Sequence, residues 1–321
     1  MTLITLTDPT TGSTARIAPQ FGFNCFEFIA RVRDWSINVL DAAQDFPNST
    51  LRPSGHGIPL LFPFPNRIRA GKYSWEGRDY VIGAETGRHD NNGNAIHGFC
   101  IDRPWRVIDQ GERFVVGQFQ LSVDAPERRS LWPADFVIDI RYELRGSTLR
   151  SDIRIHNPDS ASLPWGFGTH PYFRLPLDPQ SKPARCLIQV PADSEWVLKD
   201  CLPSGARRPV SRHKDLREGE YFDVLKLDDV LTDIESSQGV IETAVIDESA
   251  GLQVTQRFDA SFREIVVFTP PQRECVCIEP YTCVTDAINL QSQGVDAGWR
   301  VLPPGASAHL WFEISAGTLL C

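Results

Sequence analysis

A period-two alternation of apolar and charged residues is the feature that most constrains how this chain can fold. Between positions 138 and 144, Ile, Ile, Tyr and Leu alternate with Asp, Arg and Glu, and positions 152–156 repeat the pattern. Such alternation is typical of a strand with one face in the core and the other in water. Gly146 lies in the short connection between the two runs, as a hairpin turn requires. The two runs are therefore predicted to pair as an antiparallel hairpin.

Other segments have the length and borders of strands, because they are short, apolar and flanked by Gly, Pro, Asn or Asp. They are residues 114–123, 187–190, 252–258, 265–269, 276–278 and 309–315. The chain has 24 Pro and 23 Gly, which interrupt helices and supply turns, and no segment has the pattern of a long amphipathic helix. We predict an all-β fold, a large antiparallel β-sandwich with few short helices. No repeat or linker divides the chain, so residues 1–321 are predicted to form a single domain.

Charge and hydropathy exclude several classes of partner. The formal net charge of −9 argues against a nucleic-acid partner, because phosphate binding needs a concentrated basic face. No apolar run is long enough to cross a bilayer, and the first residues lack the pattern of a signal peptide. We expect a cytoplasmic protein that binds no membrane. The eight cysteines are scattered without an export signal and are predicted to be reduced thiols.

Two segments more than a hundred positions apart carry groups suited to proton transfer. His170 lies between a glycine-rich approach and Pro171-Tyr172-Phe173, and Glu279 follows an apolar run and precedes Pro280. A histidine and a carboxylate together can deliver one proton and remove another, which suffices to isomerise a small polar molecule. No local spacing of metal ligands is present, and we predict no metal and no cofactor.

The proline-rich segment 58–67 is apolar, but its prolines remove the N–H groups that a central strand needs. It is predicted to form a rigid loop that carries Asn66 and Arg67 into a site.

These segments resemble, in order along the chain, those of the aldose 1-epimerase or galactose mutarotase family. The resemblance spans most of the chain, and four blocks in the family's order make a chance match improbable. The blocks are Asn66-Arg67-Ile68 with Gly71-Lys-Tyr-Ser-Trp75-Glu-Gly77-Arg-Asp-Tyr80, Asn94-Ala-Ile-His97-Gly98-Phe99, His170-Pro171-Tyr172-Phe173, and Glu279-Pro280.

The resemblance implies an extended antiparallel β-sandwich that binds a sugar in a cleft on one sheet and interconverts its α and β anomers without a cofactor. It assigns His170 as the general acid and Glu279 as the general base, with His97 beside the reacting end of the sugar. To open a pyranose ring, the ring oxygen must gain a proton while the anomeric hydroxyl loses one. His170 would then carry a proton near neutral pH, which nearby carboxylates would favour.

The resemblance also implies a set of residues that bind the sugar. Asn66 and Arg67 would contact its hydroxyls together with an Asp from a Leu-Asp-x-x-hydrophobic segment. The segment at 227–231 fits that pattern, with Asp228 preferred and Asp229 open as a rival. The ring of Tyr172 would offer an apolar face to the sugar, although large aromatic residues near a sheet are usually core.

Two departures from the family pattern lie near the expected sugar site. The run from Pro280 to Asn289 contains neither the Gln nor the His that many mutarotases carry soon after the base, and Phe99 stands where some carry a second Gly after the His-Gly pair. They leave the predicted acid and base in place and bear on which sugar is bound.

The leading hypothesis is an aldose 1-epimerase that acts on a free hexose, as a monomer or homodimer. A hexose-6-phosphate 1-epimerase is the close alternative, for which Arg67, Arg69, Arg88 and Arg174 are candidate phosphate ligands. A non-catalytic carbohydrate-binding module on the same fold is the third hypothesis. It has no need of a matched acid and base.

Overall fold

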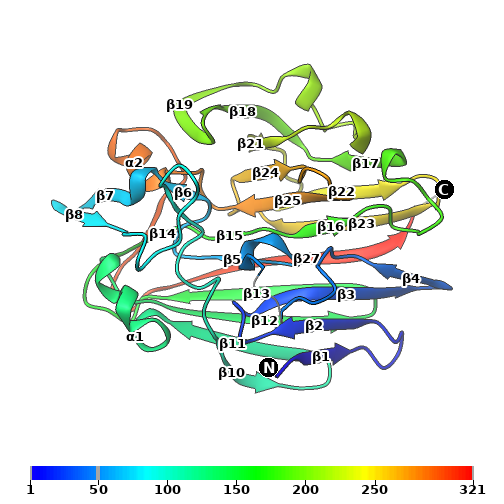
Figure 1. Ribbon diagram of the computed structural model, residues 1–321, viewed down its shortest axis with the longest axis horizontal. Coiled ribbons are helices and arrows are strands. Elements are labelled where there is room, and N and C mark those ends of the chain that lie inside the picture. The colour runs from blue at the N-terminus through cyan, green and yellow to red at the C-terminus, as the bar shows by residue number, and fades with distance from the viewer. Residues whose placement is uncertain (1, 48–50, 320–321) are drawn as a thin grey trace.

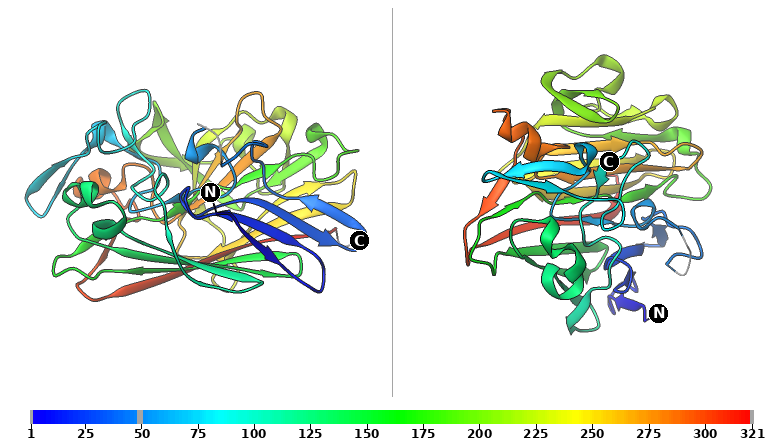
Figure 2. Two further views of the ribbon diagram at one scale, coloured as in Figure 1. Left: turned by 60° about the horizontal axis from the view of Figure 1, so that its bottom comes forward. Right: turned by 60° about the vertical axis from the view of Figure 1, so that its left-hand side comes forward.

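The computed structural model describes residues 2–47 and 51–319. Two large antiparallel sheets lie one against the other (Figures 1 and 2). The first sheet has nine strands, in the order β10 (Arg106–Gln110), β11 (Phe114–Gln120), β12 (Val137–Arg145), β13 (Thr148–His156), β27 (Ser307–Thr318), β23 (Leu252–Asp259), β22 (Val240–Asp247), β17 (Cys186–Gln189) and β20 (Glu220–Tyr221).

The second large sheet carries the candidate site. Its order is β19 (Leu202–Pro209), β18 (Ala192–Lys199), β21 (Asp228–Ile234), β24 (Glu264–Phe268), β25 (Cys275–Tyr281), β15 (Gly168–Thr169) and β5 (Leu60–Leu61). The short strand β16 (Tyr172–Arg174) also pairs with β25. The predicted all-β sandwich is confirmed.

Smaller sheets and short helices complete the fold. The sheets comprise β1 (Ile4–Thr7), β2 (Thr14–Ala18), β3 (Asn24–Val32) and β4 (Trp35–Asn38), then the pairs β14 (Leu163–Trp165) with β26 (Arg300–Leu302), β6 (Arg67–Ile68) with β9 (Ala95–Ile96), and β7 (Lys72–Trp75) with β8 (Arg78–Val81). The α-helical segments are α1 (Leu121–Asp124) and α2 (Ala287–Ser292). The 3-10 turns are Pro53–Gly55, Arg69–Gly71, Pro126–Leu131, Pro183–Arg185, Arg212–Lys214 and Phe222–Val224.

The predicted hairpin is present as β12 and β13, which pair from Val137 with His156 to Arg145 with Thr148. Gly146 lies in the turn with a φ of 60°, a conformation that glycine adopts without strain. The strand predicted over 114–123 ends early, because α1 begins at residue 121. The cause is Asp135, whose carboxylate accepts hydrogen bonds from the backbone and hydroxyl of Ser122 and turns the chain.

The main hydrophobic core lies between the two large sheets. It joins Ile140 and Phe312 of the nine-stranded sheet to Val267 and Ile278 of the sheet that carries the site, all essentially inaccessible to solvent. Burial of such side chains stabilises the fold by about 25 cal/mol for each Å² of apolar surface removed from water. The core fixes the second sheet, so its opposite face can hold polar groups in a defined geometry.

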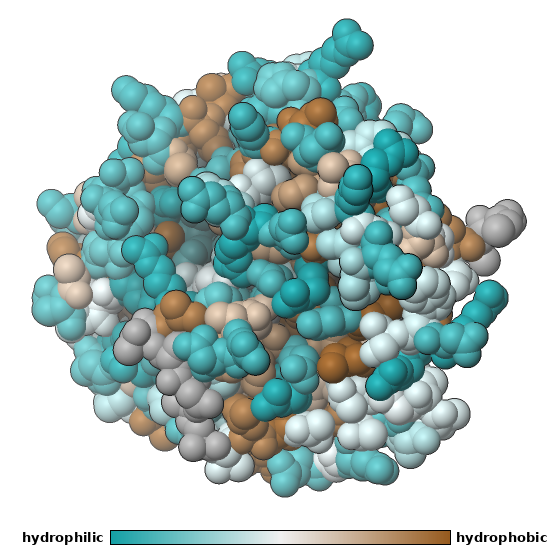
Figure 3. All heavy atoms as spheres, turned by 45° about the vertical axis from the view of Figure 1, so that its right-hand side comes forward, coloured by the Kyte–Doolittle hydropathy of each residue, from teal (hydrophilic) through white to brown (hydrophobic). Residues whose placement is uncertain are grey.

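The seven described cysteines are free thiols, and the eighth, Cys321, lies outside the described residues. Within residues 2–47 and 51–319 no helix is both long and apolar enough to cross a membrane. The face shown in Figure 3 is mostly hydrophilic, and its apolar side chains gather in small, separate patches.

Candidate active site

The register of two neighbouring strands places His170 opposite Glu279. Gly168 of β15 pairs with Tyr281 of β25, and Tyr172 of β16 pairs with Cys277, so the residues between them face each other in sequence order. Residues directly opposite in an antiparallel pair direct their side chains to the same face of the sheet. The acid and base candidates therefore meet because of strand register, although they are 109 positions apart.

The same alternation builds the floor of a cavity. On the next strand, Phe268 pairs with Cys277 and Val266 with Glu279, and on β21 Asp228 pairs with Phe268. Asp228, Val266, Phe268 and Glu279 line a cavity of about 610 Å³ together with His170, Tyr172 and Tyr281. One face of the sheet thus gathers the polar groups, while its other face lies in the core.

Loops form the walls of this cavity. Arg67 of β6 pairs with Ile96 of β9, and the backbone N–H of His97 donates to the carbonyl of Asn66 at 2.7 Å, which brings both side chains to the cavity. The prediction that residues 58–67 form a loop is wrong for Leu60–Leu61, which pair with β15 as strand β5 at the edge of the sheet, where missing proline N–H groups are tolerated. The bend at residues 63–66 then leads to Asn66 and Arg67 at the cavity. The remaining walls come from residues 52–55 and 88–92.

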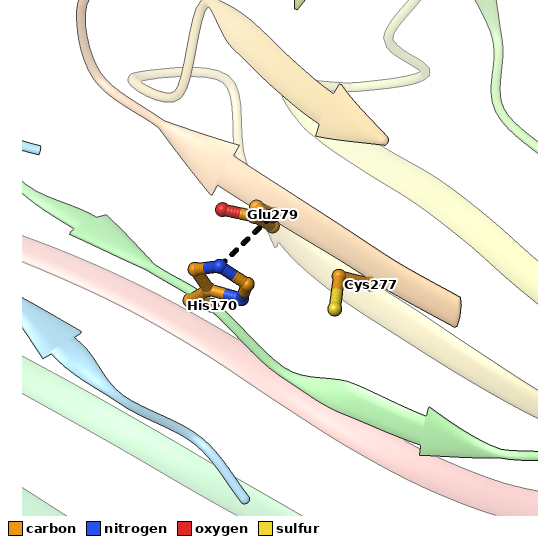
Figure 4. Close-up of side chains that lie close together, drawn as sticks. All are labelled: His170, Cys277 and Glu279. Atoms are coloured by element: carbon orange, nitrogen blue, oxygen red, sulfur yellow. Dashed lines mark ion pairs between the residues drawn. The ribbon is translucent and has the colours of Figure 1, made fainter. Parts of the chain in front are cut away.

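His170 and Glu279 form the centre of the site (Figure 4). The imidazole Nε2 lies 3.3 Å from Glu279 Oε1, and both side chains are almost fully buried. The hydroxyl of Tyr281 donates to the other carboxylate oxygen, Oε2, at 2.5 Å. The carboxylate is therefore held from both sides, with one oxygen on the histidine and one on the phenol.

Burial has opposite effects on the two pKa values. Loss of solvent, with a smaller contribution from the charges of Arg273 and Arg67, lowers the pKa of His170 to about 3. Burial also raises the pKa of Glu279 well above its ordinary value, against the hydrogen bond from Tyr281. The lowered pKa of His170 runs against the expectation that nearby carboxylates keep it protonated, because desolvation is the largest effect on this imidazole. Together the two shifts favour a neutral imidazole and a protonated carboxyl.

His97 and Tyr172 pack around the imidazole of His170. The ring of His97 meets it edge-on at 5.7 Å between centroids, and burial lowers the pKa of His97 well below its ordinary value. The ring of Tyr172 stacks on His170 at 4.8 Å, and the Tyr172 hydroxyl donates to the carbonyl of Ser54 at 2.8 Å. These contacts orient the imidazole. Contact between Tyr172 and a sugar stays a prediction.

Arg67 is held in place by its neighbours at the cavity wall. Its Nε donates to Asp90 Oδ2 at 2.7 Å, and its Nη1 donates to Asn66 Oδ1 at 2.7 Å. Asp90 also accepts hydrogen bonds from the backbone of Asn92 and Asn94. Because a guanidinium has five N–H donors, Arg67 retains donors beyond these two for a ligand in the cavity.

The two candidate aspartates lie on opposite faces of β21. Asp228 lines the cavity, whereas Asp229 forms an ion pair with Lys214 at 2.7 Å. Lys214 also pairs with the buried Glu195 at 3.0 Å. The geometry thus favours Asp228 over Asp229 as a ligand for a molecule in the cavity.

Cys277 adds a third possible metal ligand that local spacing does not reveal. In Figure 4 its sulfur and the carboxylate of Glu279 project from β25 toward His170, and the three ligand atoms lie within 4.8 Å of one another. Burial raises the pKa of the Cys277 thiol well above its ordinary value. Metal binding requires the thiolate, so an ion at this position would have to displace the proton of the Cys277 thiol.

Several residues of the site have no motif in the sequence. Tyr281 and Cys277 share a face with Glu279 because each is two positions from it, and that spacing was available as a signal. Phe268 and Arg52 have no such signal, since their neighbours in the cavity come from distant strands and loops.

The chain is similar to known proteins over most of its length. The chain is 24% identical over 265 residues to the uncharacterized protein YihR of Escherichia coli K12, which covers 82% of this chain and 80% of that protein. Its fold matches a galactose mutarotase-like protein from Clostridium acetobutylicum with a TM-score of 0.85 and 21% identity, over 99% of both chains. It also matches galactose 1-epimerase from Lactobacillus acidophilus with a TM-score of 0.73 and 15% identity, over 99% of this chain and 95% of that one. The family model for aldose 1-epimerase matches residues 30–315, so the chain belongs to the aldose 1-epimerase family.

Proposed function

We propose that this protein is an aldose 1-epimerase that interconverts the α and β anomers of a hexose, with His170 as general acid and Glu279 as general base. The observation that carries the proposal is the buried pair of Nε2 and Oε1, 3.3 Å apart on the floor of a polar cavity. The anomeric oxygen and the ring oxygen of a pyranose are bonded to one carbon. An acid and a base that serve both oxygens must therefore be close neighbours.

The proton count of the pair suits ring opening. In the reactive form, imidazolium donates a proton to the ring oxygen while carboxylate removes one from the anomeric hydroxyl. This step leaves a neutral imidazole and a protonated Glu279, so the pair again holds one proton, which now comes from the anomeric hydroxyl. The pair thus needs no exchange with solvent between ring opening and ring closure. After the aldehyde group rotates, the reverse transfers close the ring on its other face.

The walls of the cavity supply groups that fit sugar hydroxyls. Asn66, Arg67 and Asp228 offer donors and acceptors around the pair, and His97 lies beside His170 with its ring neutral. We propose that His97 and Arg67 position the sugar at its reacting end. A non-catalytic binding module is the weaker hypothesis. Burial of an adjacent acid and base lowers the stability of the fold, and a site that only binds a sugar has no need of such a pair.

Polarimetry tests the proposal with freshly dissolved α-D-glucose, α-D-galactose and α-D-glucose 6-phosphate. Wild-type protein should accelerate mutarotation of at least one of them over buffer. His170→Ala and Glu279→Gln should each reduce that acceleration at least about 100-fold, the usual contribution of a general acid or base.

Glu264→Gln is the matched control. It makes the same chemical change at a glutamate that is also buried but does not line the cavity. Acceleration that persists in both site variants would contradict the assigned roles. Saturable sugar binding without any acceleration would favour the non-catalytic module.

A further inference from the structure

Two arginines that line the cavity have no acidic partner among the described residues. Arg52 is exposed on one wall, and Arg88 is half-buried on another, where its Nε is shielded from water without a hydrogen-bond partner. Neither forms an ion pair within the described part of the chain. A guanidinium that lines a cavity without an acidic partner points to an anionic ligand that could pair with it.

The nearby carboxylates are engaged elsewhere. Asp90 accepts from Arg67 at 2.7 Å. Asp102, which attracts Arg88, is bound through both oxygens by Arg128 at 2.7 and 2.9 Å. Positive charge at this end of the cavity is therefore in excess over the carboxylates that could neutralise it.

The electrostatics of Arg88 show the same imbalance. Burial lowers its pKa, and the charges of Arg52 and Arg128 lower it further, against the attraction of Asp102. Like charges this close repel in a partly desolvated site. An anion bound between Arg52 and Arg88 would relieve that repulsion.

The position of Arg88 relates to the reacting end of the sugar through His97. The backbone N–H of Ile96 donates to the carbonyl of Arg88 at 2.9 Å, so Arg88 lies beside the segment that carries His97, and the ring of His97 contacts that of His170. His170 is assigned to the ring oxygen, which is bonded to C5. Because C6 is also bonded to C5, a substituent on C6 lies on the same side of the sugar as the ring oxygen.

We propose that the substrate is an aldose with an anionic group, phosphate or carboxylate, on C6, and that Arg52 and Arg88 bind this anion. This inference rests on the proposed epimerase function and narrows its substrate class from the free hexose expected above. Of the other arginines considered as phosphate ligands, Arg69 pairs with Asp286 and Arg174 with Asp41, and neither lines the cavity.

Exchange of anomers at equilibrium, followed by NMR, tests the proposal with glucose, glucose 6-phosphate and glucuronate. Wild-type kcat/KM should be highest for an anionic sugar, and the preferred one distinguishes phosphate from carboxylate. Arg88→Gln should lower the ratio of anionic to neutral kcat/KM by about 10- to 100-fold, through KM. Arg88→Lys keeps the positive charge but loses the planar pair of N–H donors of the guanidinium, and it should restore part of the ratio. Arg69→Gln is the control and should keep the wild-type ratio.

Thermal unfolding in inorganic phosphate gives a readout that does not depend on catalysis. Phosphate should raise the Tm of the wild type in a concentration-dependent way, and it should do so less in Arg52→Gln and Arg88→Gln. Because the neighbouring charges of Arg52 and Arg128 repel Arg88, replacement of Arg88 should not lower the Tm in phosphate-free buffer. That result would also show that the variant is folded.

The possible outcomes separate this proposal from the epimerase function. If neutral and anionic sugars are epimerised equally and the ratio is unchanged in Arg88→Gln, the anion site is refuted while the function stands. If no sugar is epimerised but phosphate stabilises the wild type through Arg52 and Arg88, the anion site stands and the function falls. If phosphate raises the Tm of wild type and both variants equally, the site is refuted.

Discussion

Tyr281→Phe removes the hydroxyl that holds Glu279 and leaves the size of the side chain almost unchanged. The phenol donates to Oε2 at 2.5 Å in a buried site, and burial raises its own pKa well above the ordinary value, so it remains a donor. A hydrogen bond to a charged group contributes about 1.5–3 kcal/mol. Its loss disfavours the carboxylate form of Glu279 and should lower kcat/KM by about 10- to 150-fold.

The pH dependence of this variant follows from the sign of the effect. The hydrogen bond from Tyr281 lowers the pKa of Glu279, so its removal raises that pKa further. The His170–Glu279 pair then keeps its single proton to higher pH. The alkaline limb of the kcat/KM profile should move to higher pH, and activity on the plateau should fall. Raising the pH should not rescue the variant, because it removes the proton that the reaction needs.

Stopped-flow polarimetry from pH 5.5 to 10 measures both effects with the preferred sugar. Tyr142→Phe is the matched control, since Tyr142 is fully buried in the other sheet and its hydroxyl has no hydrogen-bond partner within the described structure. It should keep the wild-type profile. A uniform loss of activity in Tyr281→Phe with an unshifted alkaline limb would refute the reasoning and leave Tyr281 a purely structural role.

Four further predictions concern stability and binding. Glu264 is buried and its folded-state pKa is raised from 4.5 to about 7, so it stabilises the fold fully below pH 4.5 and progressively less as the pH rises to 7. At about 1.36 kcal/mol per pKa unit, the free energy of unfolding of Glu264→Gln, measured in urea, should rise by about 3 kcal/mol relative to that of the wild type between pH 4.5 and 8. Glu195→Gln should have the opposite effect in a lower pH window, because ion pairs with Arg208 and Lys214 lower the pKa of that buried carboxyl: the wild type should be the more stable protein above pH 4.5, and its advantage should shrink as the pH falls below that value. A difference that does not change with pH in either window would contradict this reasoning. Gly98→Ala should destabilise by more than about 2 kcal/mol in the same assay, since a Cβ would lie 2.1 Å from the Phe62 carbonyl at a φ of +68°, whereas Gly93→Ala, with no atom within 4 Å, should show only the cost of positive φ. Asp90→Asn should raise KM about tenfold with little change in kcat, because it releases Arg67 from its 2.7 Å contact; a fall in kcat alone would argue against a binding role.

The parts of the fold that could be predicted are the strands that have one face exposed to solvent and the other in the core. The hairpin of β12 and β13 alternates between core and water along its whole length, and its pattern is unambiguous. Strand β25 is buried on both faces, so it has no alternation, and only its apolar centre at 276–278 was predicted. Strand β19 contains two prolines and a glycine, which locally favour a loop. It forms a strand because it lies at the edge of the sheet, where a missing proline N–H is tolerated.

Some residues of the candidate site could also be predicted from the sequence, and others could not. His170 and Glu279 have distinctive neighbours in sequence, and a family resemblance connects them. The hydrogen bond from Tyr281 depends on the burial of β25, and the position of Arg88 near His97 depends on how loop 88–92 folds over the sheet. Loop placement reflects many weak long-range contacts, which no local pattern encodes.

The register that sets His170 opposite Glu279 has a consequence for how such a protein can change. One residue inserted into or deleted from β15, β16 or β25 would turn His170 or Glu279 toward the core, so the sheet tolerates substitutions but not changes of length. The loops at 52–55 and 88–92 have no such restriction. New substrates should therefore be reached by lengthening or replacing these loops, and a library confined to them would vary what is bound while the proton-transfer chemistry is inherited intact.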